Sequence, residues 1–429
     1  MNRLGDALLE RYAEFAAPTV IEELRELVDD LRGLRIQEIN STRKGGGCAE
    51  MLSSMIAFLE GLGFDVRWDV ISAEPEFFRV TKTLHNFLQG RDGFSPSMIK
   101  IYWDTLRKNA EILDKDVDVI VIHDPQPAGL IEFLSSEERR GKKIIWRCHV
   151  HLETIPLAKM REVESFLRGM IEKYDAAIFS TFDFLPLWDV VSFVIPPYID
   201  PLSEKNMELS QEEVGKVLNK YGLDLNKPLV TQVSRFDHFK DPLGVIAAFK
   251  RVREKTPCQL LLVGGGASDD PEYQEVLAEV RSAAQNHPDI HILDLPPDSH
   301  REINAFQRAS SVIVQKSIKE GFGLTVTEGL WKAKPVVAGR VGGILLQIRD
   351  GWNGFLVSSV EETAERIYYL LKNPKMAEEM GRRGREFVRE HYLLPRGARC
   401  HLAAIHQLIN GRITSKRTIL SYHPWIPLG

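Results

Sequence analysis

The sequence predicts an α/β protein built from two doubly wound domains. Three observations support this fold class. The chain has 429 residues, and at roughly 150 residues per domain that length suggests two or three domains. Short apolar runs rich in Val and Ile alternate with amphipathic stretches, which is typical of parallel sheets covered by helices on both faces. The alternation breaks at the Pro-rich region 196–228 and then restarts.

The first half of the chain opens with a helical extension over residues 1–32, where apolar residues recur at helical spacing. Strands are then predicted at 34–40, 63–71, 116–123, 142–150 and 176–180. Helical stretches such as ESFLRGMIEKY lie between them. Residues 33–215 are therefore expected to form the first doubly wound domain.

The second half repeats this pattern over residues 216–395. Its strands are predicted at 228–236, 258–266, 290–295, 311–317 and 334–339, with helices between and after them. Residues 396–412 are expected to return to the first domain as a helix. The tail 413–429 carries no periodic pattern and is given no structure and no function.

Composition excludes several classes of protein. A hydrophobic fraction of 44% and a charged fraction of 27% are those of an ordinary globular chain, not of a disordered one. The net charge of −5 argues against a protein that coats nucleic acid. No apolar run approaches the roughly 20 residues that span a bilayer, and the N-terminus lacks the features of a secretory signal, so a cytoplasmic protein is expected.

The four cysteines lie far apart in the sequence and show neither a CxxC pair nor a Cys/His cluster at zinc spacing. They are expected to be reduced thiols, and no metal site is predicted.

A glycine-rich loop lies between the first strand and the following helix, in Lys44-Gly45-Gly46-Gly47-Cys48. Gly46 and Gly47 would let the backbone approach an anionic ligand closely. The loop is neither a Walker A loop nor a GxGxxG fingerprint. A tight turn explains it as well as a ligand cradle does.

Arg235 and Lys240 follow the first strand of the second domain. Two cations at the end of such a strand suit a diphosphate, the guanidinium as a fork and the ammonium as a point charge. Taken alone, they are more typical of two solvated surface cations.

A second glycine-rich segment lies between two glutamates, after the strand at 311–317. Its residues are Glu320, Gly321, Phe322, Gly323 and Leu324, with Glu328 further along. The backbone amides of 321–324 would form an anion site at a helix N-terminus. Glu320 would accept hydrogen bonds from sugar hydroxyls, and Glu328, in the first helical turn, would reach a ribose. Either glutamate alone is more typical of dipole complementation, whereas the glycine-rich loop between the two glutamates favours a ligand site.

His149 and His151 lie at the end of the strand 142–150 and share a face of it. Either one is as readily a structural histidine as a functional one. Gly264-Gly265-Gly266 ends another strand and is expected to form a tight turn near the nucleotide.

The string Glu-Gly-Phe-Gly-Leu…Glu, with Arg and Lys upstream, resembles the retaining GT-B glycosyltransferases, which include glycogen and sucrose synthases. STRKGGGCAEML, VIHDPQPAGL, IIWRCHVHLE and SRFDHFKDPLGVIAAF are similar to segments of the trehalose glycosyltransferring synthases of archaea and thermophilic bacteria. The resemblance covers about 34 to 395. It implies two Rossmann-like domains that face one another across a deep cleft, the first of them binding the acceptor.

The resemblance also implies the reaction and the partners. The donor would be ADP-glucose or UDP-glucose, the acceptor glucose and the product trehalose, in a reversible transfer with retention. Arg235 and Lys240 would hold the diphosphate, Glu320 the donor glucose, Glu328 the ribose, and His149 would take the place of the family's catalytic histidine. Where this chain has His151, related sequences often have Asp.

No cofactor and no metal for holding the diphosphate are expected, nor any partner nucleic acid or membrane, whereas a homodimer stays open. Other readings stay open too: a sucrose- or glycogen-synthase-like enzyme, a trehalose phosphorylase, a sugar-nucleotide 2-epimerase, and a sugar-binding protein without catalysis.

Overall fold

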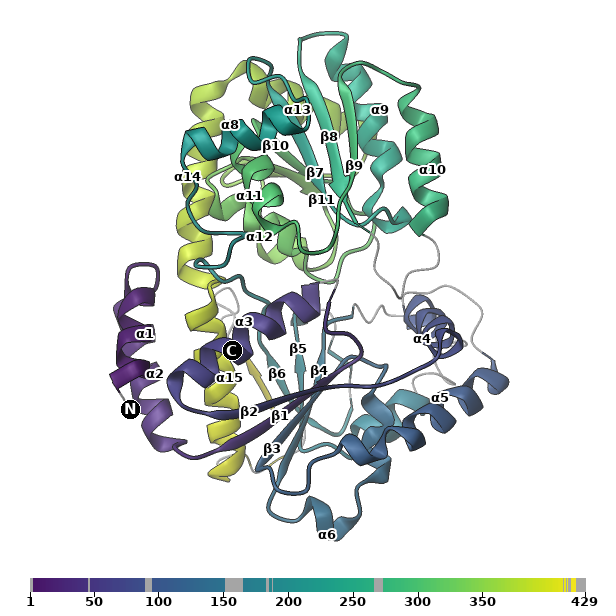
Figure 1. Ribbon diagram of the computed structural model, residues 1–429, viewed down its shortest axis with the longest axis vertical. Helices are drawn as coiled ribbons and strands as arrows, with labels where there is room; N and C mark the ends of the chain where they lie inside the picture. The colour runs from purple at the N-terminus through teal and green to yellow at the C-terminus, as the bar shows by residue number, and fades with distance from the viewer. Residues whose placement is uncertain are drawn as a thin grey trace. The chain divides into compact units, whose positions relative to one another are not determined.

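The computed structural model describes residues 3–44, 47–88, 95–150, 165–182, 185–186, 188–265, 273–411, 413, 415 and 418–421. The chain forms two compact units (Figure 1). The first combines Met1–Pro197 with Leu394–Gly429, and the second is the continuous stretch Tyr198–Leu393.

The first unit is built on a seven-stranded sheet in the order β13-β6-β5-β4-β3-β1-β2, in which every described pairing is parallel. The strands are β1 (Arg35–Asn40), β2 (Asp65–Val70), β3 (Val119–His123), β4 (Lys143–Cys148), β5 (Ala176–Phe179), β6 (Val191–Val194) and β13 (Ile419–Ser421). All five residues of β3 are buried, as expected for a parallel strand that is covered on both faces.

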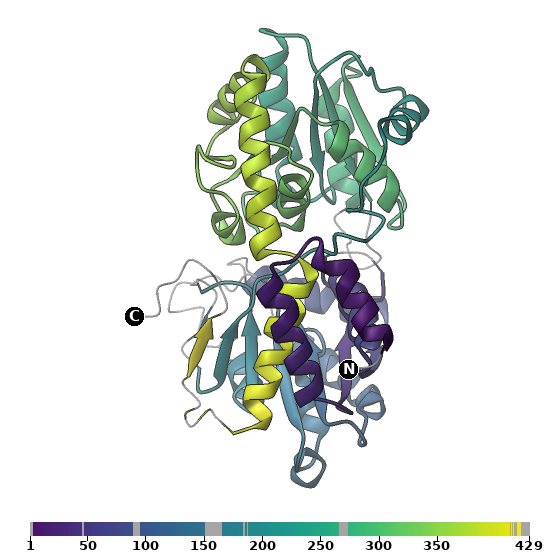
Figure 2. The ribbon, with the colours of Figure 1, turned by 90° about the vertical axis from the view of Figure 1, so that its left-hand side faces the viewer.

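Helices cover both faces of this sheet. They are α1 (Arg3–Ala13), α2 (Pro18–Asp30), α3 (Gly47–Leu62), α4 (Pro75–Leu88), α5 (Pro96–Lys108), α6 (Ser136–Arg139) and α15 (Leu394–Ile409), with 3₁₀ turns η1 (Ala110–Ile112) and η2 (Ala128–Phe133). The helix α15, yellow in Figure 2, packs against α2 and α3. The C-terminal part of the chain thus completes the first unit.

The second unit has a six-stranded sheet in the order β12-β11-β10-β7-β8-β9, again with parallel pairings. Its strands are β7 (Leu229–Val233), β8 (Gln259–Gly264), β9 (Ile290–Asp294), β10 (Val312–Gln315), β11 (Val336–Gly339) and β12 (Phe355–Val357). Its helices are α8 (Gln211–Lys220), α9 (Pro242–Arg253), α10 (Tyr273–Ala284), α11 (His300–Ala309), α12 (Leu324–Trp331), α13 (Val360–Lys372) and α14 (Pro374–His391), with 3₁₀ turns η4 (His238–Lys240) and η5 (Gly342–Leu346).

Two apolar cores lie on the two faces of the second sheet. Leu260 and Leu262 of β8 belong to one core, and the alternating residues Leu261 and Val263 belong to the other. This alternation follows from the pleat, which directs successive side chains to opposite faces. The predicted class, α/β with two parallel sheets, is confirmed.

The boundary between the units differs from the predicted one at 215/216. The second unit begins at Tyr198 because the segment before α8 binds helix α12. The carbonyl oxygen of Asn206 accepts a hydrogen bond from Trp331 Nε1 at 3.1 Å, and its side-chain oxygen accepts one from Lys332 Nζ at 2.9 Å. The unit ends at Leu393, just before the predicted 395.

Three strands were absent from the sequence-based prediction. β6 and β12 have four and three residues, too few for a periodic pattern to be read. The prediction of an unstructured tail is wrong at Ile419–Ser421, because β13 pairs with β6 at the sheet edge. Within the described parts of the chain, no helix combines the length and apolarity needed to cross a membrane.

Candidate active site

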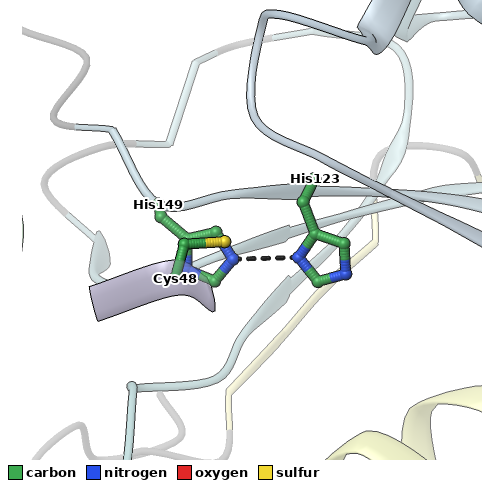
Figure 3. Close-up of side chains that lie close together, drawn as sticks. All are labelled: Cys48, His123 and His149. Carbon is green, nitrogen blue, oxygen red and sulfur yellow. Dashed lines mark hydrogen bonds between the residues drawn. The ribbon is translucent and has the colours of Figure 1, made fainter. Parts of the chain in front are cut away.

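In the first unit, the side chains of Cys48, His123 and His149 meet at the carboxyl ends of the strands. In the sheet, β2 lies on one side of β1, and β3 and the strands after it lie on the other side. The order of strands therefore reverses between β1 and β3. Doubly wound sheets bind their ligands at such a switch point, outside the carboxyl ends of the strands. Cys48 lies in the first turn of α3, the helix that follows β1. His123 ends β3, and His149 follows β4 (Figure 3).

The two imidazoles are in direct contact. His123 Nδ1 and His149 Nε2 are 3.0 Å apart, and the rings stack with centroids separated by 5.4 Å and an interplanar angle of 5°. The Cys48 sulfur and the two imidazoles have ligand atoms that all lie within 4.8 Å of one another.

The buried carboxylate of Glu38 binds Nε2 of His123, the ring nitrogen that does not contact His149. Glu38 Oε2 lies 2.6 Å from His123 Nε2, and both side chains are almost fully buried. Burial opposes ionisation of Glu38, but His123 and His401 outweigh it and lower the pKa of Glu38 to about 2. Burial also lowers the pKa values of His123 and His149.

These pKa shifts indicate which oxygen and nitrogen atoms of Glu38, His123 and His149 carry protons. With both histidines neutral, the Glu38 carboxylate accepts the Nε2 proton of His123, so His123 Nδ1 carries a lone pair. The proton between the rings then belongs to His149 Nε2, and it is donated to His123. The two consecutive hydrogen bonds, Glu38 to His123 and His123 to His149, therefore orient the ring of His149.

Asp124 fixes the backbone of the same histidine. It has a left-handed backbone, with φ 66°, and its Oδ1 accepts the amide proton of His149 at 2.7 Å. The Cys48 thiol also hydrogen-bonds this carboxyl. Burial raises the pKa of Asp124 to about 7, although these hydrogen bonds oppose the rise.

The second unit has the equivalent reversal between β7 and β10, which are neighbours in its sheet. Arg235 and Lys240 lie in the segment after β7, with Lys240 at the end of η4. Glu320 lies between β10 and α12. The topology thus brings together the two predicted segments that carry Lys240 and Glu320, which are far apart in sequence.

An ion pair joins these two segments. Lys240 Nζ lies 2.6 Å from Glu320 Oε2, and the carboxylate is only 8% exposed. Ser317 Oγ donates a hydrogen bond to the same oxygen at 2.9 Å. The Lys240 carbonyl accepts one from Gln232 Nε2 at 2.8 Å. Both charges are therefore held in place before any substrate arrives.

The segment 321–324 is fixed by the following 3₁₀ turn. Gly343 N donates to the Gly321 carbonyl at 3.2 Å, and Gln347 Nε2 donates to the Phe322 carbonyl at 2.5 Å. Gly323 caps α12 in the left-handed conformation, with φ 85°. The first amides of a helix have no intrahelical carbonyl to bind, so Leu324 begins a helix end that favours an anion.

Glu328 differs from its prediction. It lies in the second turn of α12, not the first, and it is fully buried. Lys205 Nζ binds its Oε1 at 2.9 Å, and Gln307 Nε2 binds its Oε2 at 2.8 Å. Burial alone would raise its pKa, but Lys205 and Lys332 reverse this and lower the pKa of Glu328.

Comparison with known proteins identifies the family. The profile described as "Trehalose synthase, N-terminal domain" matches residues 38–186, and that of "Glycosyl transferases group 1" matches residues 215–387. A trehalose synthase from Pyrococcus horikoshii is 42% identical over 411 residues, which cover 94% of this chain and 97% of that protein. The chain belongs to the trehalose synthase family. A second member, from Rubrobacter xylanophilus, is 40% identical and covers 94% of this chain and 98% of its own.

A solved structure supports the fold of this trehalose synthase family member. An α,α-trehalose-phosphate synthase (UDP-forming) from Burkholderia xenovorans, in complex with glucose-6-phosphate, matches with a TM-score of 0.70 and 14% identity. The match covers 87% of this chain and 99% of the other. The chain therefore has the GT-B fold. Its match to the group 1 glycosyl transferases and its membership of the trehalose synthase family make it a hexosyltransferase.

The structure brings Lys240 and Glu320 of this family member together and places Arg235 on the same segment as Lys240. Gly47 begins α3. Gly46 and His151 lie outside the described residues, as does Gly266.

Sequence reasoning did not single out Glu38, His123, Asp124 and Cys48, which the structure groups around His149. A signal existed for His123 and Asp124, because they follow a buried strand at the same sheet edge as His149. The cysteines are far apart in the sequence, but Cys48 lies close to two histidines in three dimensions: Cys48, His123 and His149 come from three separate segments.

Proposed function

We propose that this enzyme transfers glucose from a nucleoside diphosphate glucose, ADP-glucose or UDP-glucose, to free glucose, forming trehalose reversibly and with retention. The observation that carries the proposal is the Lys240–Glu320 ion pair beside the start of α12, in a chain of the trehalose synthase family. The names of the related proteins supply the sugar, and the similar UDP-forming synthase supplies the nucleotide class.

In this proposal the second unit binds the donor. Arg235 and Lys240 bind the diphosphate together with the amides of 321–324, and Glu320 accepts hydrogen bonds from the glucosyl hydroxyls. Its contact with Lys240 suits this role, because the sugar and the phosphates of the donor are adjacent groups. Glu328 binds the ribose hydroxyls, for which its carboxylate would exchange part of its contact with Lys205 or Gln307.

The chemistry asks mainly for stabilisation of a departing diphosphate. A nucleoside diphosphate leaves readily once its growing charge is neutralised, so fixed cations and helix amides can carry much of the catalysis. We propose that neither a metal ion nor a cofactor is needed to hold it. Retention follows if the acceptor attacks from the side on which the diphosphate leaves.

The first unit supplies the remaining groups. We propose that His149, oriented by His123 and Asp124, contacts the sugar being transferred, and that the loop with Gly46 and Gly47 lies close to substrate. Because burial lowers its pKa, His149 acts as a neutral hydrogen-bonding group rather than as a cation.

The test is a product analysis with purified protein. ADP-glucose or UDP-glucose is incubated with glucose, and the free nucleoside diphosphate and a non-reducing disaccharide are measured by chromatography. Equal amounts of both products support the proposal. Nucleotide release without disaccharide would contradict it.

Parallel reactions separate the alternatives. Trehalose with orthophosphate tests a phosphorylase, which would release glucose 1-phosphate without nucleotide. Fructose in place of glucose tests a sucrose-synthase-like reaction. Glucose-6-phosphate in place of glucose tests transfer to a sugar phosphate. An epimerase would convert the sugar nucleotide without any acceptor, and a binding protein would convert nothing.

A further inference from the structure

The first unit brings together one thiol and two imidazoles in a geometry that suits a metal ion. Cys48 Sγ and the ring nitrogens of His123 and His149 all lie within 4.8 Å of one another (Figure 3). Cys48 and His149 are half-buried, and His123 is buried. The other three cysteines are buried and lie outside this group.

The spacing is close to that of a tetrahedral zinc site. Bonds of about 2.3 Å to sulfur and 2.0–2.1 Å to nitrogen place the ligand atoms of an ideal tetrahedron about 3.3–3.6 Å apart. The two imidazole nitrogens are already 3.0 Å apart. Small rotations of the three side chains would therefore close the site, and three protein ligands leave a fourth position for water.

The surroundings of His123 also fit a metal ligand. Histidine ligands commonly donate their second N–H to a carboxylate, which fixes the tautomer and makes the ligand nitrogen more basic. Glu38 Oε2, 2.6 Å from His123 Nε2, has this arrangement. His123 Nδ1 then offers its lone pair toward Cys48 and His149.

Binding of a divalent cation at Cys48, His123 and His149 would move one proton and release another. When a divalent cation enters, the Nε2 proton of His149 moves to Nδ1 of the same ring, so that Nε2 becomes a ligand. The Cys48 thiol loses its proton to solvent and its hydrogen bond to Asp124. One proton is released for each ion bound, and no oxidant or reductant is needed.

We propose that Cys48, His123 and His149 form a site for one thiophilic divalent cation such as Zn²⁺, and that occupancy blocks the transferase by engaging His149. The thiolate and imidazole donors select zinc-like ions over Mg²⁺, which prefers oxygen ligands. The inhibitory consequence rests on the proposed function, because His149 is assigned there to the sugar.

Cobalt(II) tests the site directly, without reference to activity. Titration of the full-length protein with Co²⁺ is expected to give a thiolate-to-cobalt charge-transfer band in the near ultraviolet and tetrahedral ligand-field bands, saturating at one ion per chain. Cys48→Ala should abolish the charge-transfer band. The control Cys258→Ala, which removes a thiol in the second unit, should keep it, and circular dichroism verifies that both variants fold.

Inhibition is measured in the same proteins. Zn²⁺ should inhibit the wild type and a chelator should restore it, whereas Cys48→Ala should need at least about tenfold more Zn²⁺ for the same fractional loss of its own rate. Glu38→Gln should weaken Co²⁺ binding by about 10- to 100-fold.

A charge-transfer band that persists in Cys48→Ala, or Co²⁺ binding that is equal in both cysteine variants, would overturn the site. If Co²⁺ binds as expected but no glucosyl transfer is found, the proposed function fails and the site stands. If the wild type transfers glucose and shows no thiolate band, the site fails alone.

Discussion

At the scale of single residues, the Lys240–Glu320 pair gives the sharpest prediction. Glu320→Gln keeps the shape of the side chain and removes its charge, so kcat for glucosyl transfer should fall by about 10²–10³-fold. Affinity for ADP should change little, because Glu320 is assigned to the sugar. Steady-state kinetics and calorimetry measure the two effects, with the exposed Glu378→Gln as a control. Unchanged turnover would remove Glu320 from the site.

The guanidinium of Arg235 should act on the nucleotide instead. A lost charge-assisted hydrogen bond costs about 1.5–3 kcal/mol, so Arg235→Ala should raise the Kd for ADP by about 10- to 150-fold. Isothermal calorimetry checks this value, and Arg281→Ala, which removes an exposed arginine of α10, serves as the comparison. Wild-type affinity in Arg235→Ala would show that this residue does not hold the diphosphate.

Asp124 should make stability depend on pH. Its pKa rises from 3.8 to about 7 on folding, so between about pH 4 and pH 7 the folded state holds a proton that the unfolded chain has lost. Its contribution to stability therefore falls as pH rises, by at most about 1.4 kcal/mol per pH unit. Asn at this position keeps the acceptor and tolerates the left-handed backbone, and it does not titrate.

As pH rises from about 4 to about 7, the unfolding free energy of Asp124→Asn should therefore increase relative to that of the wild type. Urea unfolding at several pH values measures it. Asp104→Asn is the control of opposite sign, because a hydrogen bond from Lys100 lowers the pKa of Asp104. A difference for Asp124→Asn that stays constant with pH would contradict the assignment.

The residues show where sequence reasoning stops. Glu320, Arg235 and Lys240 could be selected because each follows a buried strand and carries a charge in the segment between that strand and the next helix. Cys48, His123 and His149 could not be joined, because their proximity depends on which strands are neighbours. The order β4-β3-β1 is set by the packing of the whole sheet, and no local pattern encodes it.

At the scale of elements, the start of α12 should depend on one backbone conformation. Gly323 has φ 85°, and a Cβ there would lie 3.2 Å from Glu320 Cγ. Gly323→Ala should cost about 1–2 kcal/mol of unfolding free energy. It should also lower kcat/KM by about 10- to 100-fold, because a shift of about 1 Å in a catalytic segment is enough for that.

Gly351 offers the matched control. Its φ is 78°, and a Cβ there would meet nothing within 4 Å. Gly351→Ala should lose a similar unfolding free energy, measured by urea denaturation, and keep its activity. Equal activity in the two variants would mean that the segment 321–324 does not contribute to catalysis.

The elements themselves were mostly predictable. Runs such as the five residues of β3 are buried on both faces and read as strands without context. The short β13 could not be found this way. It is a strand because β6 offers an unpaired edge, to which Ile419 and its neighbours add.

At the scale of the whole molecule, the two units differ in how the chain builds them. The first needs both ends of the sequence, because α15 packs on α2 and α3, and Arg399 forms an ion pair with Glu23. The second is the continuous stretch Tyr198–Leu393. The predicted returning helix over 396–412 corresponds to α15, whereas the start of the second unit at Tyr198 was hidden by the irregular segment before α8.

This difference predicts that Tyr198–Leu393 folds alone. It contains both of its apolar cores and all strands of its sheet, so cooperative urea unfolding is expected from the isolated fragment. Arg235, Lys240 and Glu320 all lie in the fragment. Its Kd for ADP should therefore be within about tenfold of that of the intact enzyme, a loss of no more than about 1.4 kcal/mol of binding free energy. The fragment should transfer no glucose. Calorimetry measures the binding, and the same fragment carrying Lys240→Ala should bind more weakly. A folded fragment without affinity for ADP would place the nucleotide outside the second unit.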